Sequence, residues 1–154
     1  MTDTQVPTET PAAGRNVFAR WKSFSPQFRG LLRIVAALMF MSAGTMKLFG
    51  LPSMPMAGSI PLISELGLAG TLEVFGGVLL LLGLFTRPVA FILSGEMAVA
   101  YFQAHFPRGL WPTLNGGQPA VLYCFLWLYF SAAGAGGLSI DSIIKSRRKT
   151  PGGA

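Results

Sequence analysis

Three ionisable side chains stand inside apolar stretches of this sequence, where an ion is costly. Glu73 lies within GTLEVFGGVLLLLGLF (residues 70–85), Lys47 ends an earlier apolar block, and His105 ends a later one. A carboxylate in an apolar helix of this length costs several kcal/mol unless it is paired or protonated. These residue types therefore predict either an ion pair or a site that exchanges protons and hydrogen bonds with a small molecule.

Helical geometry places Lys47 and Glu73 on faces that pack against other helices. At about 100° per residue, Lys47 shares a stripe of the first block with Arg33, and Glu73 shares a stripe of the second block with Gly70 and Gly77. Small residues permit close helix approach, so both side chains should face protein, where Lys47 can reach Glu73 from the antiparallel neighbour. Two interpretations stay open: a functional site, or a buried ion pair that only fixes helix register.

A third apolar block carries Glu96 near its middle and His105 near its end. The two residues are about two and a half helical turns apart, so they point in nearly opposite directions unless the helix unwinds before Pro107. His105 is either an interfacial histidine that hydrogen-bonds a loop carbonyl or a proton-exchanging group at the mouth of a cavity.

The composition indicates that the elements holding these residues are membrane helices. Hydrophobic residues make up 51% of the chain, charged residues make up 12%, and the mean hydropathy is +0.53. The apolar residues form blocks close to the ~20 residues that a helix needs to cross a bilayer. We therefore predict an all-α polytopic membrane protein, a bundle of four transmembrane helices over residues 31–49, 66–85, 89–104 and 120–138.

The distribution of cations predicts the orientation of this bundle. All of the 12 Lys and Arg except Lys47 and Arg108 fall beside the first helix, in the turn between the second and third helices, or in the C-terminal tail. Cytoplasmic flanks hold such an excess, so both termini should be cytoplasmic and the protein should lie in a bacterial inner membrane. Nucleic acid is not an expected partner, because the cations are split between the chain ends and lack an aromatic platform.

The same patterns divide the chain into segments. The polar N-terminus should be disordered, and a basic amphipathic cytoplasmic lead-in should precede the membrane domain. The predicted segments are residues 1–14 (disordered tail), 15–30 (lead-in), 31–142 (four-helix membrane domain) and 143–154 (basic cytoplasmic tail).

Familiar soluble active sites are not predicted. Cys124 is the single cysteine, so neither an intrachain disulfide nor a CxxC pair is available, and His105 is the single histidine. We therefore expect no metal site, and no self-contained catalytic centre is visible.

Several motifs in this order resemble the DoxX family of small four-helix membrane proteins. They are RIVAALMFMSAGTMKL, EVFGGVLLLLGLFTRP, AYFQAHFPRGLWPTLNGGQPAVLYCFLWLY and GAGGLSID, and the resemblance covers roughly residues 29–142. Two positions depart from the family pattern: Gln118 stands where a glutamate is usual, and Ala135 where proline is frequent. The motif positions are Arg33, Lys47, Glu73, Arg87, His105, Asn115, Gly116, Gly117 and Asp141.

The resemblance implies an inner-membrane protein linked to redox metabolism. Relatives include a subunit of a thiosulfate-oxidising, quinone-reducing complex and partners of thiol and superoxide defence. We therefore predict an accessory subunit of a quinone- or thiol-linked redox system. Lys47, Glu73 and His105 would bind a quinone or another small amphipathic molecule, with the lipid bilayer, a redox-partner protein and a homo-oligomer as partners.

Two alternatives remain at this stage. Glu73 and Glu96 inside the bundle also suit a small-solute or proton-coupled transporter, which four helices would form only as an oligomer. The short loops suit a non-catalytic assembly factor that contacts another membrane protein.

Overall fold

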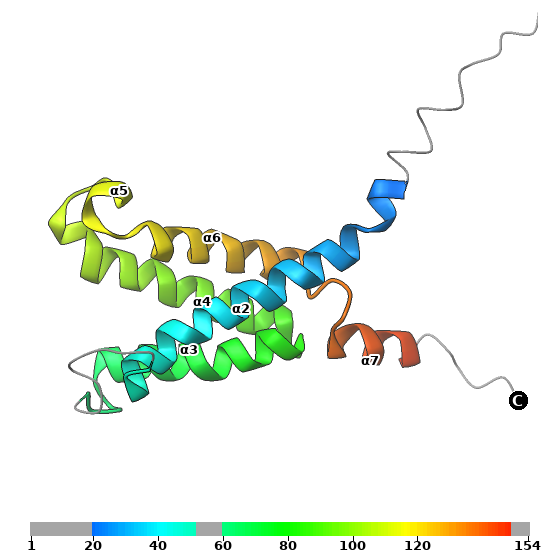
Figure 1. Cartoon of the computed structure of the whole chain (residues 1–154), viewed down its shortest axis with the longest axis horizontal. Helices are drawn as coiled ribbons and strands as arrows, with labels where there is room; N and C mark the ends of the chain where they lie inside the picture. Colours follow the sequence, from blue (N-terminus) through cyan, green and yellow to red (C-terminus); the bar gives the residue numbers. More distant parts are fainter. Residues whose placement is uncertain (1–19, 52–59, 149–154) are drawn as a thin grey trace, which may run out of the picture.

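The computed structural model describes residues 20–51 and 60–148, and every regular element in these ranges is helical (Figure 1). All four apolar blocks predicted from the sequence form helices. The elements are α2 (Ser25–Phe49), α3 (Glu65–Leu82), α4 (Thr86–Ala100), α5 (Pro112–Asn115), α6 (Gln118–Ala133) and α7 (Ile140–Arg148).

The predicted disordered tail, residues 1–14, lies outside the described residues, as do residues 15–19 of the lead-in and 149–154 of the basic tail. Residues 20–23 are helical, and α2 begins at Ser25, inside the segment predicted as a lead-in. Pro26 explains this early start, because its fixed φ and missing N–H suit the first turn of a helix. The exposed rings of Trp21 and Phe28 stack at a centroid distance of 6.3 Å.

Local chemistry sets the other helix ends. The Ser64 hydroxyl accepts a hydrogen bond from the Gly67 N–H at 3.1 Å and caps the start of α3. α3 ends before Gly83, whose φ of 65° is left-handed, so the predicted block 66–85 is shortened by one turn. α6 likewise ends at Ala133, short of the predicted residue 138, because the GAGG segment that follows leaves the helical conformation.

The helix that carries Glu96 continues beyond α4 with a change of winding. Residues Tyr101–His105 form a π-helix, and residues Phe106–Arg108 form a 3₁₀ turn, which gives one helical run over residues 86–108. Pro107 accounts for the change, since it has no N–H to donate and its ring clashes with the carbonyl one turn earlier. The helix therefore changes from α to π winding before Pro107 and continues to Arg108.

The helices pack as two antiparallel pairs, α2 with α3 and α4 with α6, joined mainly through α3 and α4 (Figure 1). Gly44 permits the close approach of α2 and α3. A Cβ at this position would lie 2.8 Å from the Cβ of Glu73 and 2.9 Å from the carbonyl oxygen of Gly70. Gly70, Glu73 and Gly77 are all buried, which confirms the inward face predicted for this stripe.

The centre of the bundle is aromatic. Trp127, Phe130 and Phe40 are at most 1% exposed. The Phe40 ring meets the Trp127 ring edge-on at 5.3 Å, and the Tyr123 ring stacks on Trp127 at 5.7 Å. This packing fixes α2 against α6 at the middle of the molecule.

The polarity of the described residues is that of a membrane protein, with charge inside and hydrocarbon outside. Arg33 and Glu73 are buried, whereas Leu38, Phe75 and Phe91 are exposed. α2 and α3 are long and apolar enough to cross a membrane, and α6 is a shorter apolar helix. Large exposed apolar surfaces of this kind face lipid or partner proteins.

The molecule has two chemically distinct ends (Figure 1). The start of α2, the α3–α4 turn, the end of α6 and α7 lie at one end, which we call the basic end because it holds Arg29, Arg33, Arg87 and Lys145. The end of α2, the start of α3 and α5 lie at the opposite end, called here the α5 end.

Candidate functional site

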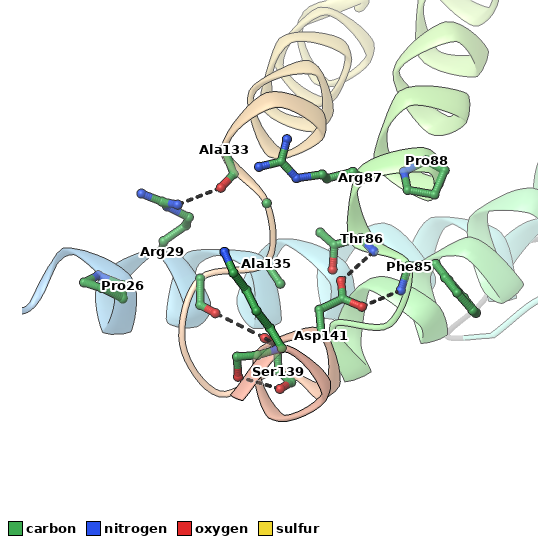
Figure 2. A pocket seen from close by; sticks show the side chains of 14 residues that line it. Pro26, Arg29, Phe85, Thr86, Arg87, Pro88, Ala133, Ala135, Ser139 and Asp141 are labelled. Atoms are coloured by element: carbon green, nitrogen blue, oxygen red, sulfur yellow. Dashed lines mark hydrogen bonds between the residues drawn. The ribbon is translucent and has the colours of Figure 1, made fainter. Parts of the chain in front are cut away.

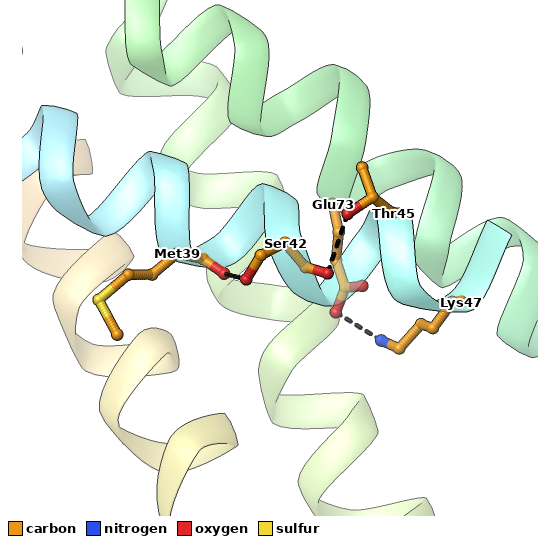
Figure 3. A network of polar contacts seen from close by, with 5 residues as sticks. All are labelled: Met39, Ser42, Thr45, Lys47 and Glu73. Carbon is orange, nitrogen blue, oxygen red and sulfur yellow. Dashed lines mark hydrogen bonds and ion pairs between the residues drawn. The ribbon is translucent and has the colours of Figure 1, made fainter. Parts of the chain in front are cut away.

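Lys47 and Glu73 meet between α2 and α3, as predicted (Figure 3). The Lys47 Nζ lies 2.5 Å from the Glu73 Oε1, and the two side chains are 25% and 3% exposed. The nearby hydroxyls of Ser42 and Thr45 donate to carbonyls of their own helix, so they are not part of the pair. The lysine stem thus carries its charge to a carboxylate that solvent hardly reaches.

Glu96, on α4, is a second carboxyl group close to this pair. Both of its oxygens are buried without a hydrogen-bond partner among the described residues, and so is the Oε2 of Glu73. Glu96 is near enough to Glu73 and Lys47 to interact with both electrostatically, and Tyr123 is near enough to interact with Glu73. We call Lys47, Glu73, Glu96 and Tyr123 the carboxyl cluster. It places two acids, one cation and one phenol in an apolar interior.

His105 belongs to a different network, at the α5 end. Its Nδ1 lies 3.2 Å from the carbonyl oxygen of Asn115, and its ring stacks on Tyr101 at 6.4 Å. The Asn115 Oδ1 accepts from the N–H of Gly117 at 2.8 Å, and its Nδ2 donates to the Gly109 carbonyl at 2.6 Å. The contact with a loop carbonyl agrees with the interfacial interpretation of His105.

The structure therefore brings together Lys47 and Glu73 but not the third residue grouped with them. Within residues 20–51 and 60–148, the polar contacts of His105 stay within its own network at the α5 end. Glu96, which we predicted to point away from His105, lies within electrostatic range of the pair. Gly116 and Gly117 belong to the Asn115 turn, where a Cβ on Gly117 would lie 2.8 Å from both the Asn115 Oδ1 and the Tyr101 ring.

Arg33 is a structural residue at the basic end. It is fully buried, and its guanidinium donates to the carbonyls of Ala135 at 3.1 Å, Leu81 at 2.7 Å and Leu138 at 2.8 Å, and also to that of Leu80. Leu80 and Leu81 stand in the last turn of α3, where carbonyls run short of intrahelical donors. The Gly83 N–H donates to the Leu80 carbonyl at 3.1 Å, and Arg33 adds donors to both carbonyls from α2. The arginine thereby ties α2, α3 and the segment after α6 to one another.

Asp141 fastens α7 to the α3–α4 turn (Figure 2). Its carboxylate accepts from the N–H of Phe85 at 3.0 Å and from that of Thr86 at 2.9 Å, which caps the start of α4. Phe85 has a φ of 49°, a left-handed conformation that is unfavourable for a residue other than glycine. The two hydrogen bonds to Asp141 stabilise the turn in this conformation. Arg87 is exposed beside this turn.

Comparison with known proteins now identifies the chain. The sequence pattern of the DoxX family matches residues 29–106, about half of the chain, which includes Arg33, Lys47, Glu73, Glu96 and His105. The chain belongs to the DoxX family. An uncharacterized protein of Haemophilus influenzae is 44% identical over 126 residues, which cover 79% of this chain and 93% of that protein. No solved structure matches the chain.

Membership confirms the resemblance predicted from the motifs and agrees with the lipid-facing surface of the bundle. This DoxX protein has alanine at position 135, where proline is frequent in the family. Arg33 bonds the backbone carbonyl of Ala135, a group that proline would also present at this position. Gln118 is the first residue of α6, and nothing in the structure assigns it a role.

Sequence reasoning did not include Tyr123 in the site of this DoxX protein, because a tyrosine in an apolar block is indistinguishable from a packing residue. The hydroxyl of Ser94 was also missed; it donates to the carbonyl of Cys124 at 2.8 Å and joins α4 to α6. In the part of the chain that the structure describes, no three His, Cys, Asp or Glu residues are grouped as a metal site would require.

Proposed function

We propose that this DoxX protein crosses the bacterial inner membrane four times through its domain of residues 31–142, with both termini in the cytoplasm. The helical run over residues 86–108 has the length of a span, and α6 packs along α4. The basic end gathers Arg29, Arg87 and Lys145, as the cytoplasmic side of a membrane protein does. The α5 end, with the network of His105, then faces the periplasm.

This orientation predicts opposite labelling of two exposed positions in intact cells. In a Cys124→Ala background, Leu114→Cys on α5 should react with a membrane-impermeant maleimide, because Leu114 is 84% exposed at the outer end. Ser146→Cys on α7 should react only after the cells are permeabilised. Labelling of Ser146→Cys but not of Leu114→Cys in intact cells would reverse the proposed topology.

We further propose that the chain is an accessory subunit of a redox system and binds a small amphipathic molecule with hydrogen-bond-accepting oxygens, such as a quinone, at the carboxyl cluster. The observation that carries this proposal is Glu96, whose carboxyl oxygens are buried without a partner among the described residues, within electrostatic range of the lysine–glutamate pair. An ionisable group at membrane depth without a partner is typical of ligand and proton pathways.

The residues of the cluster fit the chemistry of a quinone headgroup. Lys47 has three N–H donors, and its hydrogen bond to a described residue is the one to Glu73, so further donors would be available to the carbonyl oxygens of a ligand. One cation balances one carboxylate in an apolar interior, and Glu96 in its protonated form would be a further donor and a proton store. A bound quinone would supply two-electron chemistry, while these residues would orient it and hold its protons. The exposed apolar faces would contact lipid, a redox-partner protein or a second copy of the chain.

Quinone binding can be followed through Trp127, whose ring stacks on Tyr123. In a Trp21→Phe/Trp111→Phe background, a short-chain ubiquinone should quench the fluorescence of Trp127 saturably in mild detergent. Glu96→Gln and Lys47→Met should each weaken binding about tenfold, as expected for the loss of a charge-assisted hydrogen bond. Glu65→Gln, at an exposed carboxylate on α3, is the matched control. Quenching that does not saturate, or that is equal in all variants, together with no quinone in lipid extracts, would contradict the proposal.

The carboxyl of Glu96, which has no partner in the described part of the chain, also favours a second function, that of a proton-coupled transporter assembled from several chains. Purified protein in proteoliposomes distinguishes the two proposals. A proton or solute flux that disappears in both Glu73→Gln and Glu96→Gln, without saturable quinone binding, would select the transporter.

A further inference from the structure

A cavity of about 500 Å³ opens at the basic end, and no residue of the carboxyl cluster lines it (Figure 2). The start of α2, the α3–α4 turn, the end of α6 and the first turns of α7 form its walls. Its charged lining consists of three cations, Arg29, Arg87 and Lys145, and one anion, Asp141.

The single anion does not neutralise these cations. Both carboxylate oxygens of Asp141 accept backbone N–H bonds, from Phe85 and from Thr86. Arg29 donates to the carbonyl of Ala133 at 2.8 Å, while its Nε is buried without a partner among the described residues. The lining therefore keeps an excess of positive charge.

The hydroxyl of Thr86 is a second, independent sign of a missing ligand. Thr86 is fully buried and lines the cavity, and its Oγ1 has no hydrogen-bond partner in the part of the chain that the structure describes. A buried hydroxyl without a partner costs free energy, and such groups in native proteins usually have an explanation. A ligand oxygen in the cavity would supply the partner.

Arg87 is placed to meet such a ligand. Its guanidinium lies at the end of α6, on the other side of Ala133 from the guanidinium of Arg29 (Figure 2). A Cβ on Gly134 would lie 3.4 Å from the Nε of Arg87, so the glycine leaves room for the arginine beside the backbone. Arg87 makes no hydrogen bond to another residue of the cavity lining (Figure 2), so its planar set of donors can face a ligand there.

We propose that this cavity binds the phosphate group of an anionic ligand. Arginine binds phosphate oxygens through paired N–H donors, lysine adds a point charge, and a hydroxyl adds a neutral donor. The exposed ring of Phe85 borders the cavity and offers an apolar surface next to the cations. Phosphate of this chemistry reaches a cytoplasmic membrane surface as a phospholipid headgroup or as a soluble phosphate ester. Only the choice of membrane side rests on the topology proposed above.

The test uses the full chain and has one arm for each source of phosphate. In the lipid arm, the protein is placed in nanodiscs of phosphatidylcholine with increasing phosphatidylglycerol. In the soluble arm, it is kept in detergent and titrated with inorganic phosphate and with glycerol 3-phosphate. The readout in both arms is the thermal unfolding midpoint as a function of ligand concentration.

The wild-type midpoint should rise saturably in at least one arm, and that arm identifies the source. Arg87→Gln should raise the half-saturating concentration about tenfold, and Lys145→Gln and Thr86→Val should each raise it several-fold. Lys22→Gln, which removes an exposed cation outside the cavity, should leave it unchanged. Arg87 and Lys145 are exposed, so their variants should fold. No saturable rise in either arm, or an equal loss in Lys22→Gln and Arg87→Gln, would overturn the proposal. Quinone quenching of Trp127 is read separately and does not depend on this result.

Discussion

Replacing Arg33 with leucine is expected to lower the free energy of unfolding by about 5 kcal/mol or more, close to the whole stability of a typical small domain. The guanidinium donates to four backbone carbonyls at the basic end. A hydrogen bond to a charged group contributes about 1.5–3 kcal/mol, and each buried carbonyl left without a donor costs a further ~1–3 kcal/mol. Unfolding in mixed micelles of increasing SDS content measures the change.

Two further variants separate the geometry of Arg33 from its charge. Arg33→Lys keeps the charge but cannot reach four acceptors with a rigid planar group, so its stability should fall between those of the wild type and Arg33→Leu. Arg20→Leu removes an exposed arginine from the same end of the chain and should be nearly neutral. A fully stable Arg33→Leu protein would show that the carbonyls do not depend on this residue.

The Lys47–Glu73 pair should give a non-additive result. Lys47→Met or Glu73→Met alone leaves one charge unpaired inside the bundle, which typically costs about 3–5 kcal/mol. The double variant removes both charges and should be close to the wild type in stability, because well-packed apolar residues often replace a buried ion pair at little cost. Thermal unfolding of the four proteins in one detergent completes the cycle.

This cycle also decides between the two interpretations of the pair. If the double variant is stable but a quinone no longer quenches its Trp127 fluorescence, the pair is assigned to ligand binding. A stable double variant that binds as the wild type does would leave it only a structural role. If the double variant loses as much stability as the two single variants together, the two residues do not interact, contrary to the 2.5 Å contact.

The parts of the fold that follow from periodicity were predictable. Four apolar blocks predicted four helices, and the inward stripes of Lys47 and Glu73 predicted their contact, because side-chain direction in a helix depends only on the residue number. The ends of the second and fourth blocks were placed too late. Hydropathy continues smoothly across Gly83 and Gly134, whereas the backbone turns there.

The parts that depend on backbone groups could not be predicted. Arg33 was assigned to an inward face, but its acceptors are carbonyls, which every residue has and which leave no mark on the sequence. The same holds for Asp141, a motif position whose partners are two backbone N–H groups. The π-helix that carries His105 likewise has no periodic signature in the sequence.

The arrangement around Arg33 also bears on how the chain is made. The acceptors on α3 follow Arg33 by 47 and 48 residues, and those after α6 follow it by 102 and 105 residues. During synthesis α2 is therefore made long before the carbonyl groups that accept from its arginine exist. The donors of Arg33 need other partners until residues 135–138 have been made, so the basic end can form only after most of the chain is complete.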